Sequence, residues 1–409
     1  MSSEDISRKV SKVSIVGGTY QETCYWPPWD ELYGSGWRAV RVFRIFCPDA
    51  DITFHTIGDN QVEKVLRVFA KSEKLSYKLT KSSSNIGFFY NHPLARPLIH
   101  GYKEGKIPLY IKGDFVIGFG MLEAQTYIEG GWVVYDPQSP KHPLSFRKQG
   151  GKAKHLALVL NESEAKQLSG ETELPQIREL LFEREDCECM IVKRGAKGAV
   201  VFSSKDDEGI VVPVYKTTHV FPIGSGDVFT TVFSWFWFCG YKPMAAAMLA
   251  SKAAAAYCEE KGLIDAIPKH LKEVVYKELI PEKKGLVYLA GPFFTLNAKL
   301  FVSECRNMLL AMGLRVFSPY HDVGEGKAEN VVPKDIENLK KCSCVFAIVD
   351  GLDSGTLFEV GYAVAIGKKV VAYVENETEE ALKMLVGTGC DIEKDYTTAI
   401  YKAYWYAAE

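Results

Sequence analysis

Short apolar runs alternate with longer helical patterns along most of this 409-residue chain. Such alternation builds parallel α/β sheets, because each helix carries the chain back to the start of the next parallel strand. The helix that starts near Asp227 is expected to continue through residues 243–262. Strands are expected at 13–18, 51–58, 115–120, 132–137, 156–161 and 189–195, followed by an antiparallel pair at 198–202 and 210–215.

A charged stretch at residues 268–285 interrupts the alternation, and its prolines and lysines are typical of a linker. A chain of this length also exceeds one ordinary hydrophobic core. We therefore expect one domain over 1–275, a linker over 276–285 and a smaller domain over 286–409. In the smaller domain, strands are expected at 286–292, 315–319, 344–350 and 368–374, and helices at 297–312 and 357–366.

The composition argues against several classes of partner. The net charge is −2, and no Lys/Arg run supplies the basic face that nucleic-acid binding needs. The longest apolar run, 228–239, is shorter than the roughly 20 residues that cross a bilayer. The polar N-terminal segment is not typical of a signal peptide, and the ten scattered cysteines are consistent with reduced thiols. We expect a cytoplasmic protein that binds neither nucleic acid nor membranes.

The most informative segment is VFAIVDGLDSGTLFEVGYAVAIGKKVVAYV, which starts at residue 345. Its order of buried strand, acidic loop, short helix and buried strand predicts a βαβ unit. The loop then lies at the carboxyl edge of the sheet, where open α/β folds bind ligands. Asp350, Asp353 and Glu359 share this edge, with Gly355 and Thr356 at the start of the helix. A structural alternative is open, since Asp353 or Ser354 can cap the helix and Glu359, expected in the first turn, suits the macrodipole.

The strings VYLAGPFF and DGLDSGTLFEVGYAVAIGKKVV resemble the nucleoside 2-deoxyribosyltransferase family and its N-glycosidase relatives, over about residues 285–409. The resemblance implies that Glu359 is the nucleophile that attacks the anomeric carbon. It also implies that Asp353 and Asp335 are acids of the site and that Tyr288 orients the glutamate. A core tyrosine is the alternative for Tyr288. The residues expected to approach the substrate are Gly291, Pro292, Asp350, Gly355 and Thr356.

This chemistry is reasonable for a carboxylate. N-glycosidic cleavage passes through an oxocarbenium-like state, which a carboxylate stabilises and can trap as an ester, while a second acid protonates the departing base. The resemblance implies small-molecule N-glycosides as substrates, no cofactor for this domain, and a homo-oligomer in which a neighbouring subunit contributes an asparagine. That asparagine has no evident counterpart here. Transfer and hydrolysis both stay open, as do nucleoside, nucleotide and NAD-like substrates.

The first domain carries a glycine turn before its apolar helix, in FPIGSGDVF at residues 221–229. The backbone N–H groups of Gly224, Ser225 and Gly226 at a helix N-terminus suit the charge of a phosphoryl group. Asp227 would accept the proton of an attacking hydroxyl. An ordinary helix cap is the alternative.

PIGSGD resembles the signature of the PfkB/ribokinase family of sugar and nucleoside kinases, over about residues 11–265. VVYDPQSP, with Asp136, and LVLNESEAKQLSG support the resemblance, which implies ATP and Mg²⁺ as cofactors. Asn161 and Glu164 would hold Mg²⁺ through water, and VKRGAKGAVVF would place Gly195 and Gly198 near the nucleotide. The two resemblances together imply a ribokinase-like three-layer α/β/α domain followed by a smaller flavodoxin- or Rossmann-like parallel-sheet domain.

Two positions depart from the kinase pattern. Phe221 and Pro222 stand where the family has Asp-Thr, and Arg38 stands near an expected asparagine. An arginine there suits a phosphate or carboxylate better than a free sugar. Three hypotheses follow. The first is a bifunctional enzyme of nucleoside metabolism, with a glycosidic site and an ATP-dependent kinase site. The second is an N-glycosidase gated by a degenerate, nucleotide-sensing PfkB domain, and the third is a non-enzymatic pair of binding modules.

Overall fold

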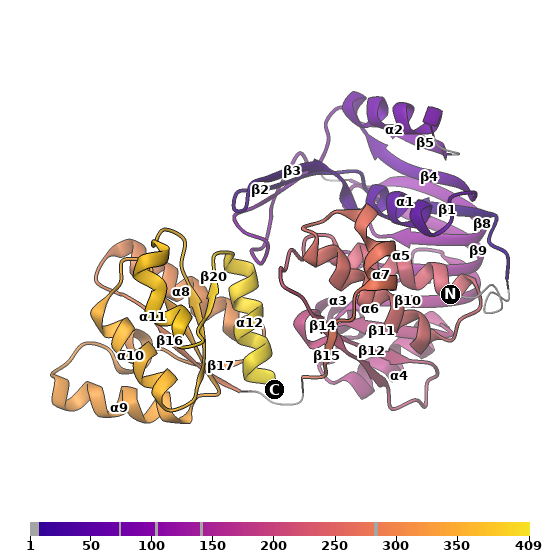
Figure 1. Cartoon of the computed structure of the whole chain (residues 1–409). Coiled ribbons are helices and arrows are strands. Elements are labelled where there is room, and N and C mark those ends of the chain that lie inside the picture. The colour runs from indigo at the N-terminus through magenta and orange to yellow at the C-terminus, as the bar shows by residue number, and fades with distance from the viewer. Residues whose placement is uncertain (1–7, 73–74, 103–104, 140–141, 282–284) are drawn as a thin grey trace. The chain divides into compact units, whose positions relative to one another are not determined.

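The structure is a computed structural model that describes residues 8–72, 75–102, 105–139, 142–281 and 285–409. The chain divides into two compact units (Figure 1). The N-terminal unit comprises Met1–Thr217 and Phe221–Ile280, and the C-terminal unit comprises Thr218–Val220 and Pro281–Glu409. Residues 282–284 of the expected linker lie outside the described residues.

A large sheet forms the centre of the N-terminal unit. Over the described residues it has nine strands in the order β13-β12-β11-β10-β9-β8-β1-β4-β5. The strands from β11 to β5 are parallel, and β12 and β13 form the expected antiparallel pair. Their bounds are β1 (Lys12–Val16), β4 (Asp51–Gly58), β5 (Leu75–Lys81), β8 (Ile107–Phe119), β9 (Ala124–Asp136), β10 (Lys152–Asn161), β11 (Cys189–Lys193), β12 (Ala199–Phe202) and β13 (Ile210–Val212).

Strands β8 and β9 each change direction near the middle. A straight strand of 13 residues is about 43 Å long, yet Lys106 and Gly120, which flank β8, line one small pocket. The ladder between the two strands skips Asp114 and Gly131, next to a glycine in each strand. Only the second half of each strand stands out in the sequence, because these glycines interrupt the apolar runs.

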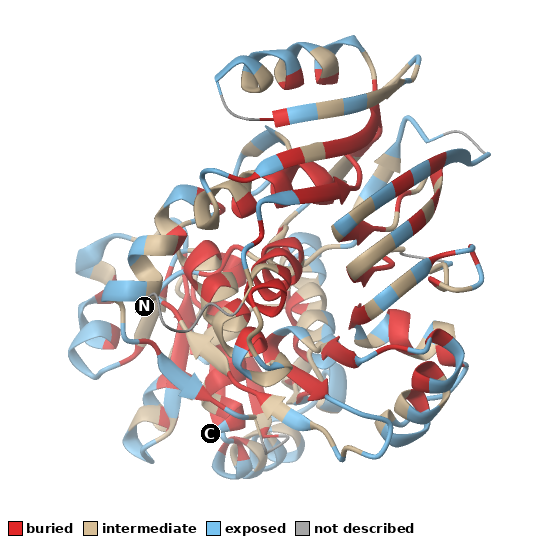
Figure 2. Ribbon diagram, turned by 90° about the vertical axis from the view of Figure 1, so that its right-hand side faces the viewer, coloured by how far each residue is buried: buried red, intermediate tan, exposed pale blue. Residues whose placement is uncertain are grey.

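Helices cover both faces of this sheet. Buried side chains place α1, α2, α5, α6 and α7 on one face and α3 and α4 on the other, which is the expected three-layer arrangement. Figure 2 shows the buried residues concentrated in the strands and in the helices that pack on them. The bounds are α1 (Gly34–Phe46), α2 (Asn60–Ser72), α3 (Glu162–Ser169), α4 (Leu174–Glu185), α5 (Ser225–Phe238), α6 (Pro243–Glu259) and α7 (Ile267–Glu273).

The helix expected to continue from Asp227 through residues 243–262 is in fact two helices, so this prediction is wrong. Gly240, with a φ of 101°, follows the end of α5, and α6 begins at Pro243. Glycine readily adopts positive φ after a helix end, and proline suits a first helical turn because its missing N–H needs no partner there.

Shorter strands complete the N-terminal unit. A second sheet has, in the part of the chain that is described, four strands in the order β3-β2-β6-β7. Pro213 divides the expected strand 210–215 into β13 and β14, and β14 pairs with β15 inside the range expected as linker. The bounds are β2 (Gln21–Cys24), β3 (Trp29–Leu32), β6 (Gly87–Tyr90), β7 (Leu98–His100), β14 (Val214–Lys216) and β15 (Lys277–Leu279).

The C-terminal unit is built on a parallel sheet, which over residues 285–409 has the order β17-β16-β18-β19-β20. Helices α9, α10 and α11 cover one face, and α8 and α12 pack together on the other. The strand order is that of a flavodoxin-like sheet, as expected. The strands are β16 (Leu286–Ala290), β17 (Arg315–Phe317), β18 (Cys344–Ile348), β19 (Lys369–Tyr373) and β20 (Asp391–Glu393). The helices are α8 (Leu296–Ala311), α9 (Ala328–Lys341), α10 (Ser354–Ala365), α11 (Glu379–Gly387) and α12 (Tyr396–Ala408).

Within the described ranges, no helix of either unit combines the length and the apolar character needed to cross a membrane.

Candidate functional site

The strand order of the C-terminal unit determines where a ligand is expected. The chain passes from β16 to β17 on one side and then to β18 on the other, so the order reverses between β16 and β18. Open α/β sheets bind ligands outside the carboxyl ends of the strands at such a point. Gly291 and Pro292 follow β16 at this edge, and the acidic loop 350–353 follows β18.

Tyr288 and Glu359 meet at this edge. Tyr288 is fully buried in β16, and its hydroxyl donates a 2.6 Å hydrogen bond to Oε1 of Glu359 in α10. Burial raises the pKa of Glu359 to about 7; Asp335 and Asp353 also raise it, and the hydrogen bond from Tyr288 opposes the rise. A carboxyl with this pKa is about half ionised at neutral pH. Tyr288 is therefore both a buried core residue and a partner of the predicted nucleophile.

Asp335 comes from α9, the helix that leads into β18. Its Oδ1 is buried without a hydrogen-bond partner among the described residues, and burial raises the pKa of its carboxyl. Buried polar atoms are nearly always hydrogen-bonded, so such an oxygen is expected where a ligand or a water completes a site. Because Asp335 raises the pKa of Glu359, the two carboxyls are near enough to interact.

Asp353 is the N-cap of α10. Its Oδ2 accepts hydrogen bonds from the backbone N–H of Thr356 at 2.8 Å and from the Thr356 hydroxyl at 2.9 Å. Leu352, with a φ of 48°, turns the chain into this cap, and Gly355 is exposed in the first turn of the helix. The capping alternative therefore describes Asp353 correctly, and its charge acts on Glu359 at the same time.

Asp350 and Gly291 have structural contacts. Asp350 accepts hydrogen bonds from the backbone N–H groups of Glu375 at 2.9 Å and Asn376 at 2.8 Å, which ties the loop after β18 to the loop after β19. A Cβ at Gly291 would lie 3.2 Å from Ile348, so a side chain there would be crowded. Asp350 thus holds the edge of the site in shape.

An aromatic pair follows the ends of β16 and β17, and the sequence did not predict it. Phe293 follows β16, and Tyr320 lies in the π-helical turn Pro319–Val323 that follows β17. The two rings stack with their centroids 5.5 Å apart, and Nζ of Lys299 lies 5.3 Å from the Tyr320 ring. Flat aromatic rings suit stacking on a planar base. The available sequence signal is the position of both aromatics just after a buried strand.

The glycine turn of the N-terminal unit is in contact with Arg38. Gly224, with a φ of 82°, is the N-cap of α5, and Asp227 lies in the first turn. A Cβ at Gly224 would lie 2.2 Å from Cζ of Arg38. Nη1 of Arg38 donates to Oδ2 of Asp227 at 2.7 Å, and Nε2 of Gln138 donates to Oδ1. Both carboxylate oxygens of Asp227 therefore accept hydrogen bonds from the protein itself.

Arg38 is fully buried and has further partners. Glu22 in β2 accepts from Nη1 at 3.2 Å and from Nη2, and the Tyr257 hydroxyl accepts from Nε at 3.2 Å. Burial alone lowers the pKa of the guanidinium, but Glu22, Tyr257 and Asp227 outweigh burial and raise it well above its ordinary value. Arg38 is thus a permanent cation. Glu22 and Tyr257 were not predicted, because partners so distant in the chain leave no local pattern.

A second ion pair lies beside the turn. Nζ of Lys193 in β11 pairs with Asp136 at the end of β9, and the Thr230 hydroxyl donates to Oδ2 of Asp136 at 2.7 Å. A Cβ at Gly226 would lie 3.6 Å from Nζ of Lys193. Burial raises the pKa of Asp136, and its Oδ1 is buried without a partner in the described part of the chain.

Asn161 and Glu164 form a reciprocal capping box at the start of α3. Oδ1 of Asn161 accepts from the Glu164 N–H at 2.9 Å, and Oε2 of Glu164 accepts from the Asn161 N–H at 2.8 Å. Burial and the charge of Asp136 raise the pKa of Glu164 to about 7. Gly195 and Gly198, with φ of 58° and 79°, turn the chain between β11 and β12. Each of these four residues, out of the seven predicted to bind the cofactor, therefore has a structural role.

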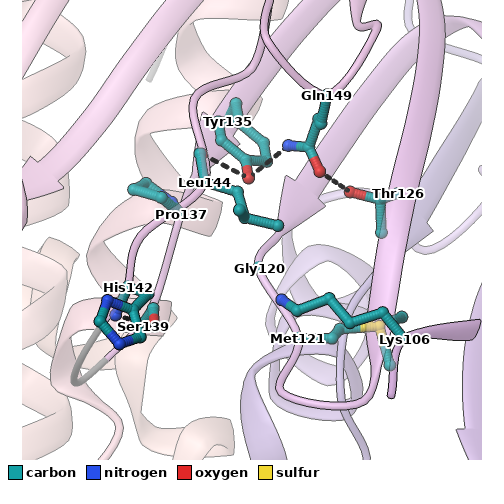
Figure 3. Close-up of a pocket in the computed structure, with 11 residues that line it drawn as sticks. Lys106, Gly120, Met121, Thr126, Tyr135, Pro137, Ser139, His142, Leu144 and Gln149 are labelled. Carbon is teal, nitrogen blue, oxygen red and sulfur yellow. Dashed lines mark hydrogen bonds between the residues drawn. The ribbon is translucent and has the colours of Figure 1, made fainter. Parts of the chain in front are cut away.

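A small pocket lies beside the ends of β8 and β9 (Figure 3). Figure 3 shows Lys106 reaching toward it from one side, with His142 on the other. Gln149 links the Tyr135 hydroxyl (2.6 Å) and the Thr126 hydroxyl (3.5 Å) by hydrogen bonds. The cavity volume of about 10 Å³ has room for about one water, so this pocket does not accommodate a nucleoside.

Two family models match the chain. Residues 133–270 match the model of the pfkB family carbohydrate kinases, and residues 287–395 match the model of nucleoside 2-deoxyribosyltransferase. The chain joins a PfkB-like unit to a nucleoside 2-deoxyribosyltransferase-like unit. The N-terminal unit is thus the PfkB-like unit, and the C-terminal unit is the transferase-like unit. No curated protein matches the chain significantly.

Solved structures of ribokinase-family kinases resemble the PfkB-like unit. A ribokinase from Giardia lamblia is 14% identical with a TM-score of 0.51, and the match covers 65% of this chain and 98% of that chain. A fructokinase double mutant from Vibrio cholerae is 14% identical over 64% and 96% of the two chains, with a TM-score of 0.48. A ribokinase from Thermotoga maritima is 17% identical over 63% and 99%, with a TM-score of 0.45. At these identities the likeness concerns the fold alone.

The kinase resemblance implies ATP and Mg²⁺ as cofactors, and the residues of the PfkB-like unit can be compared with what these groups need. Across the described residues, no group of three or more His, Cys, Asp or Glu side chains is arranged to hold a metal ion. The Gly224 turn would have to meet the transferred phosphoryl group, and the guanidinium of Arg38 covers it. The guanidinium of Arg38 therefore lies beside Gly224, on the side where an added Cβ would be.

Proposed function

We propose that the transferase-like unit cleaves the N-glycosidic bond of a nucleoside or a related small-molecule N-glycoside, with Glu359 as the nucleophile. The observation that carries the proposal is the 2.6 Å hydrogen bond from the buried Tyr288 hydroxyl to Glu359, close to a carboxyl oxygen of Asp335 that has no partner among the described residues. The match of residues 287–395 to the nucleoside 2-deoxyribosyltransferase model supports the same chemistry.

The proposed reaction follows from the two carboxyls. Tyr288 donates to Oε1 of Glu359, so Oε2 is the oxygen that attacks the anomeric carbon. A C–O bond to Glu359 forms while the C–N bond breaks, and the electron pair of the broken bond goes to the base. Asp335, the second acid of the site, gives its proton to the base. Water or a second base then attacks the anomeric carbon, the C–O bond to Glu359 breaks with its electron pair returning to the carboxylate, and the proton of the attacking group passes to Asp335.

The electrostatic environment favours this step. Positive charge develops on the sugar in the oxocarbenium-like state, and an anion at a buried site interacts with it more strongly than an anion in water does. Burial of Glu359 is the largest cause of its raised pKa. The proton on Glu359 therefore has to leave before the attack, and the reaction is expected to depend on pH near neutrality.

Phosphorylation of a nucleoside or sugar by the PfkB-like unit would require Asp227 to accept a proton. Arg38 and Gln138 already donate to both of its carboxylate oxygens. The glycosidic reaction is therefore the function that the geometry supports best.

A product panel tests the proposal. The full chain is mixed with ribonucleosides, deoxynucleosides, nucleotides or NAD, with and without a second base, and the products are identified by mass spectrometry. Free base is expected, and a new nucleoside appears with the second base if the unit is a transferase. Denatured protein from the reaction is expected to carry the mass of one sugar on the peptide that contains Glu359.

Matched variants complete the test. Glu359→Ala is expected to lower base release by several orders of magnitude, because the nucleophile is lost. Glu337→Ala removes an exposed carboxylate of α9, 62% accessible, and is expected to leave the rate unchanged. Base release that persists in Glu359→Ala at the wild-type rate overturns the proposal.

A further inference from the structure

We propose that Arg38 permanently occupies the phosphoryl-acceptor site of the PfkB-like unit, so that this unit does not transfer phosphoryl groups to a hydroxyl. The inference does not depend on the glycosidic function, because it concerns a different sheet and different residues.

The strand order places the acceptor site. The large sheet reverses its order at β1, with β4 and β5 on one side and β8 to β11 on the other. A ligand is therefore expected outside the carboxyl ends of β1 and β8. Gly17 follows β1 here, and α1 comes so close that a Cβ at Gly17 would lie 2.7 Å from Cα of Gly36. This close approach brings Arg38, two residues further along α1, to the same edge.

The guanidinium fills the space that an acceptor needs. A hydroxyl in position for phosphoryl transfer lies against the glycine turn and within hydrogen-bond reach of Asp227. Arg38 already satisfies both conditions, since Cζ and Nε lie 2.2 and 2.3 Å from an added Cβ on Gly224, and Nη1 lies 2.7 Å from Asp227. Its exposed fraction is 0%.

Contacts on the far side hold the guanidinium in place. Glu22 accepts from two of its nitrogens and also from the Gly34 N–H at 2.9 Å. Tyr257 accepts from Nε and donates to the Ile223 carbonyl at 2.9 Å. Moving Arg38 away would leave Glu22 and Asp227 as buried carboxylates without their cation, which is strongly unfavourable. Arg38 is therefore not a side chain that a ligand readily displaces.

Gln138 supplies the second donor to Asp227 from an unusual backbone conformation. Its φ of 32° lies in the left-handed region, which residues other than glycine rarely adopt, and its Nε2 donates to Oδ1 of Asp227. Such conformations persist when the surrounding structure enforces them. A general base needs a lone pair that faces the substrate hydroxyl, and a donor of the protein already takes one lone pair of each oxygen of Asp227.

Tyr20 fills a second position in the crevice at the carboxyl ends of β1 and β8. Its ring lies 2.0 Å from the position of a Cβ at Gly18, two residues after β1, and its hydroxyl donates to Glu123 in the loop after β8 at 2.8 Å. Tyr20 is only 6% exposed. The chain's own side chains thus occupy the crevice beside β1 as well as the glycine turn.

The first test measures turnover. The full chain carrying Glu359→Ala, which protects nucleosides from cleavage, is incubated with ATP, Mg²⁺ and a panel of pentoses and nucleosides, and ADP is measured. We expect no acceptor-dependent ADP and no difference on adding Asp227→Asn. A catalytic base contributes about 10²–10⁴-fold, so acceptor-dependent turnover that falls by this factor in Asp227→Asn overturns the proposal.

The second test uses methylguanidinium as a free replacement for the side chain. Arg38→Ala leaves a space lined by Glu22 and Asp227, and a ligand that binds only the folded state raises the Tm. Methylguanidinium chloride is expected to raise the Tm of Arg38→Ala relative to equal sodium chloride. The matched control Arg41→Ala removes an arginine of the same helix that lies 4.9 Å from the Phe69 ring, and no rise is expected there or in the wild type.

A second variant keeps this test decisive if Arg38→Ala does not fold. Glu22→Gln combined with Arg38→Ala removes one of the two carboxylates that would be left without a cation, and Asp227 remains to bind the probe. A rise in Tm with methylguanidinium in either folded variant supports the proposal. If neither variant shows a rise although at least one of them folds, compared with sodium chloride, the proposal is overturned.

Discussion

The carboxyl of Glu359 has a charge state set mainly by burial. Its pKa is raised from 4.5 to about 7, so the folded protein holds the proton more tightly than the unfolded chain does. The contribution of this group to stability is thus fully present below pH 4.5 and is lost as the pH rises through about 7. The ionised form that attacks a sugar is also the less stable form, which is a common feature of catalytic groups.

The hydrogen bond from Tyr288 opposes this rise in pKa. The rate of base release is expected to increase with pH through about 7, as Glu359 ionises. Tyr288→Phe removes a bond to the charged form and is expected to move this limb of the pH profile upward by about one unit. The measurement is kcat/KM for base release against pH. An unshifted limb would show that the tyrosine does not act on the nucleophile.

Asp335 has a different expected role, which the leaving group can test. Asp335→Asn removes the proton donor and is expected to slow release of an ordinary neutral base by about 10²-fold or more. A nucleoside whose base already carries a positive charge leaves without a proton, so the variant should cleave it nearly as fast as the wild type. The two substrates are compared by single-turnover kinetics. Equal slowing of both would assign Asp335 to positioning rather than proton donation.

At the scale of elements, the N-terminus of α10 combines a structural and an electrostatic role in Asp353. Asp353→Ala removes the cap and is expected to lower the free energy of unfolding by about 1 kcal/mol, measured by urea denaturation. Asp353→Asn keeps an oxygen that accepts from Thr356 but removes the charge that raises the pKa of Glu359. Its stability should stay near the wild-type value while the pH profile moves to lower pH. A profile unchanged in Asp353→Asn would limit this residue to capping.

The elements also show which parts of the fold could be predicted. The strands with continuous apolar runs, such as β16 and β18, were located to within a few residues, because a buried parallel strand has no polar face. The bent strands β8 and β9 and the short strands β2 and β6 were missed in whole or in part. Glycines and exposed residues interrupt the apolar pattern of β8 and β9, and β2 and β6 are only four residues long.

At the scale of the whole molecule, the homo-oligomer implied by the transferase resemblance stays a prediction. Phe294, just before α8, and Leu296 and Leu300, in its first turns, are 74%, 71% and 61% exposed, and exposed apolar groups of this kind favour association. We expect light scattering to give a mass above that of one 45.7 kDa chain. Leu300→Glu should lower this mass, whereas Val275→Glu, at a 96% exposed position of the PfkB-like unit, should not. A single-chain mass for the wild type would contradict the prediction.

The sequence by itself determined the two α/β units and the identity of the candidate glycosidic residues. Apolar runs specify buried strands because burial is their main stabilisation, and the DGLDSGTLFEVGYA string carries Asp353 and Glu359 within one local loop and helix. Local spacing of this kind survives in the sequence because both residues belong to one βαβ segment. Tyr288 and Asp335 were assigned only through the resemblance, since they come from other elements.

Only the tertiary structure decided which side chains surround the glycine turn. The sequence from Gly224 to Asp227 predicts a phosphate-binding turn with a catalytic base. The role of Asp227, however, depends on the network formed by Arg38 in α1, Glu22 in β2 and Gln138 after β9. No local sequence pattern indicates an ion pair between residues that are 189 positions apart. Burial then keeps Arg38 beside the turn, because a cation enclosed between two carboxylates cannot be exchanged for water without a large loss of electrostatic energy.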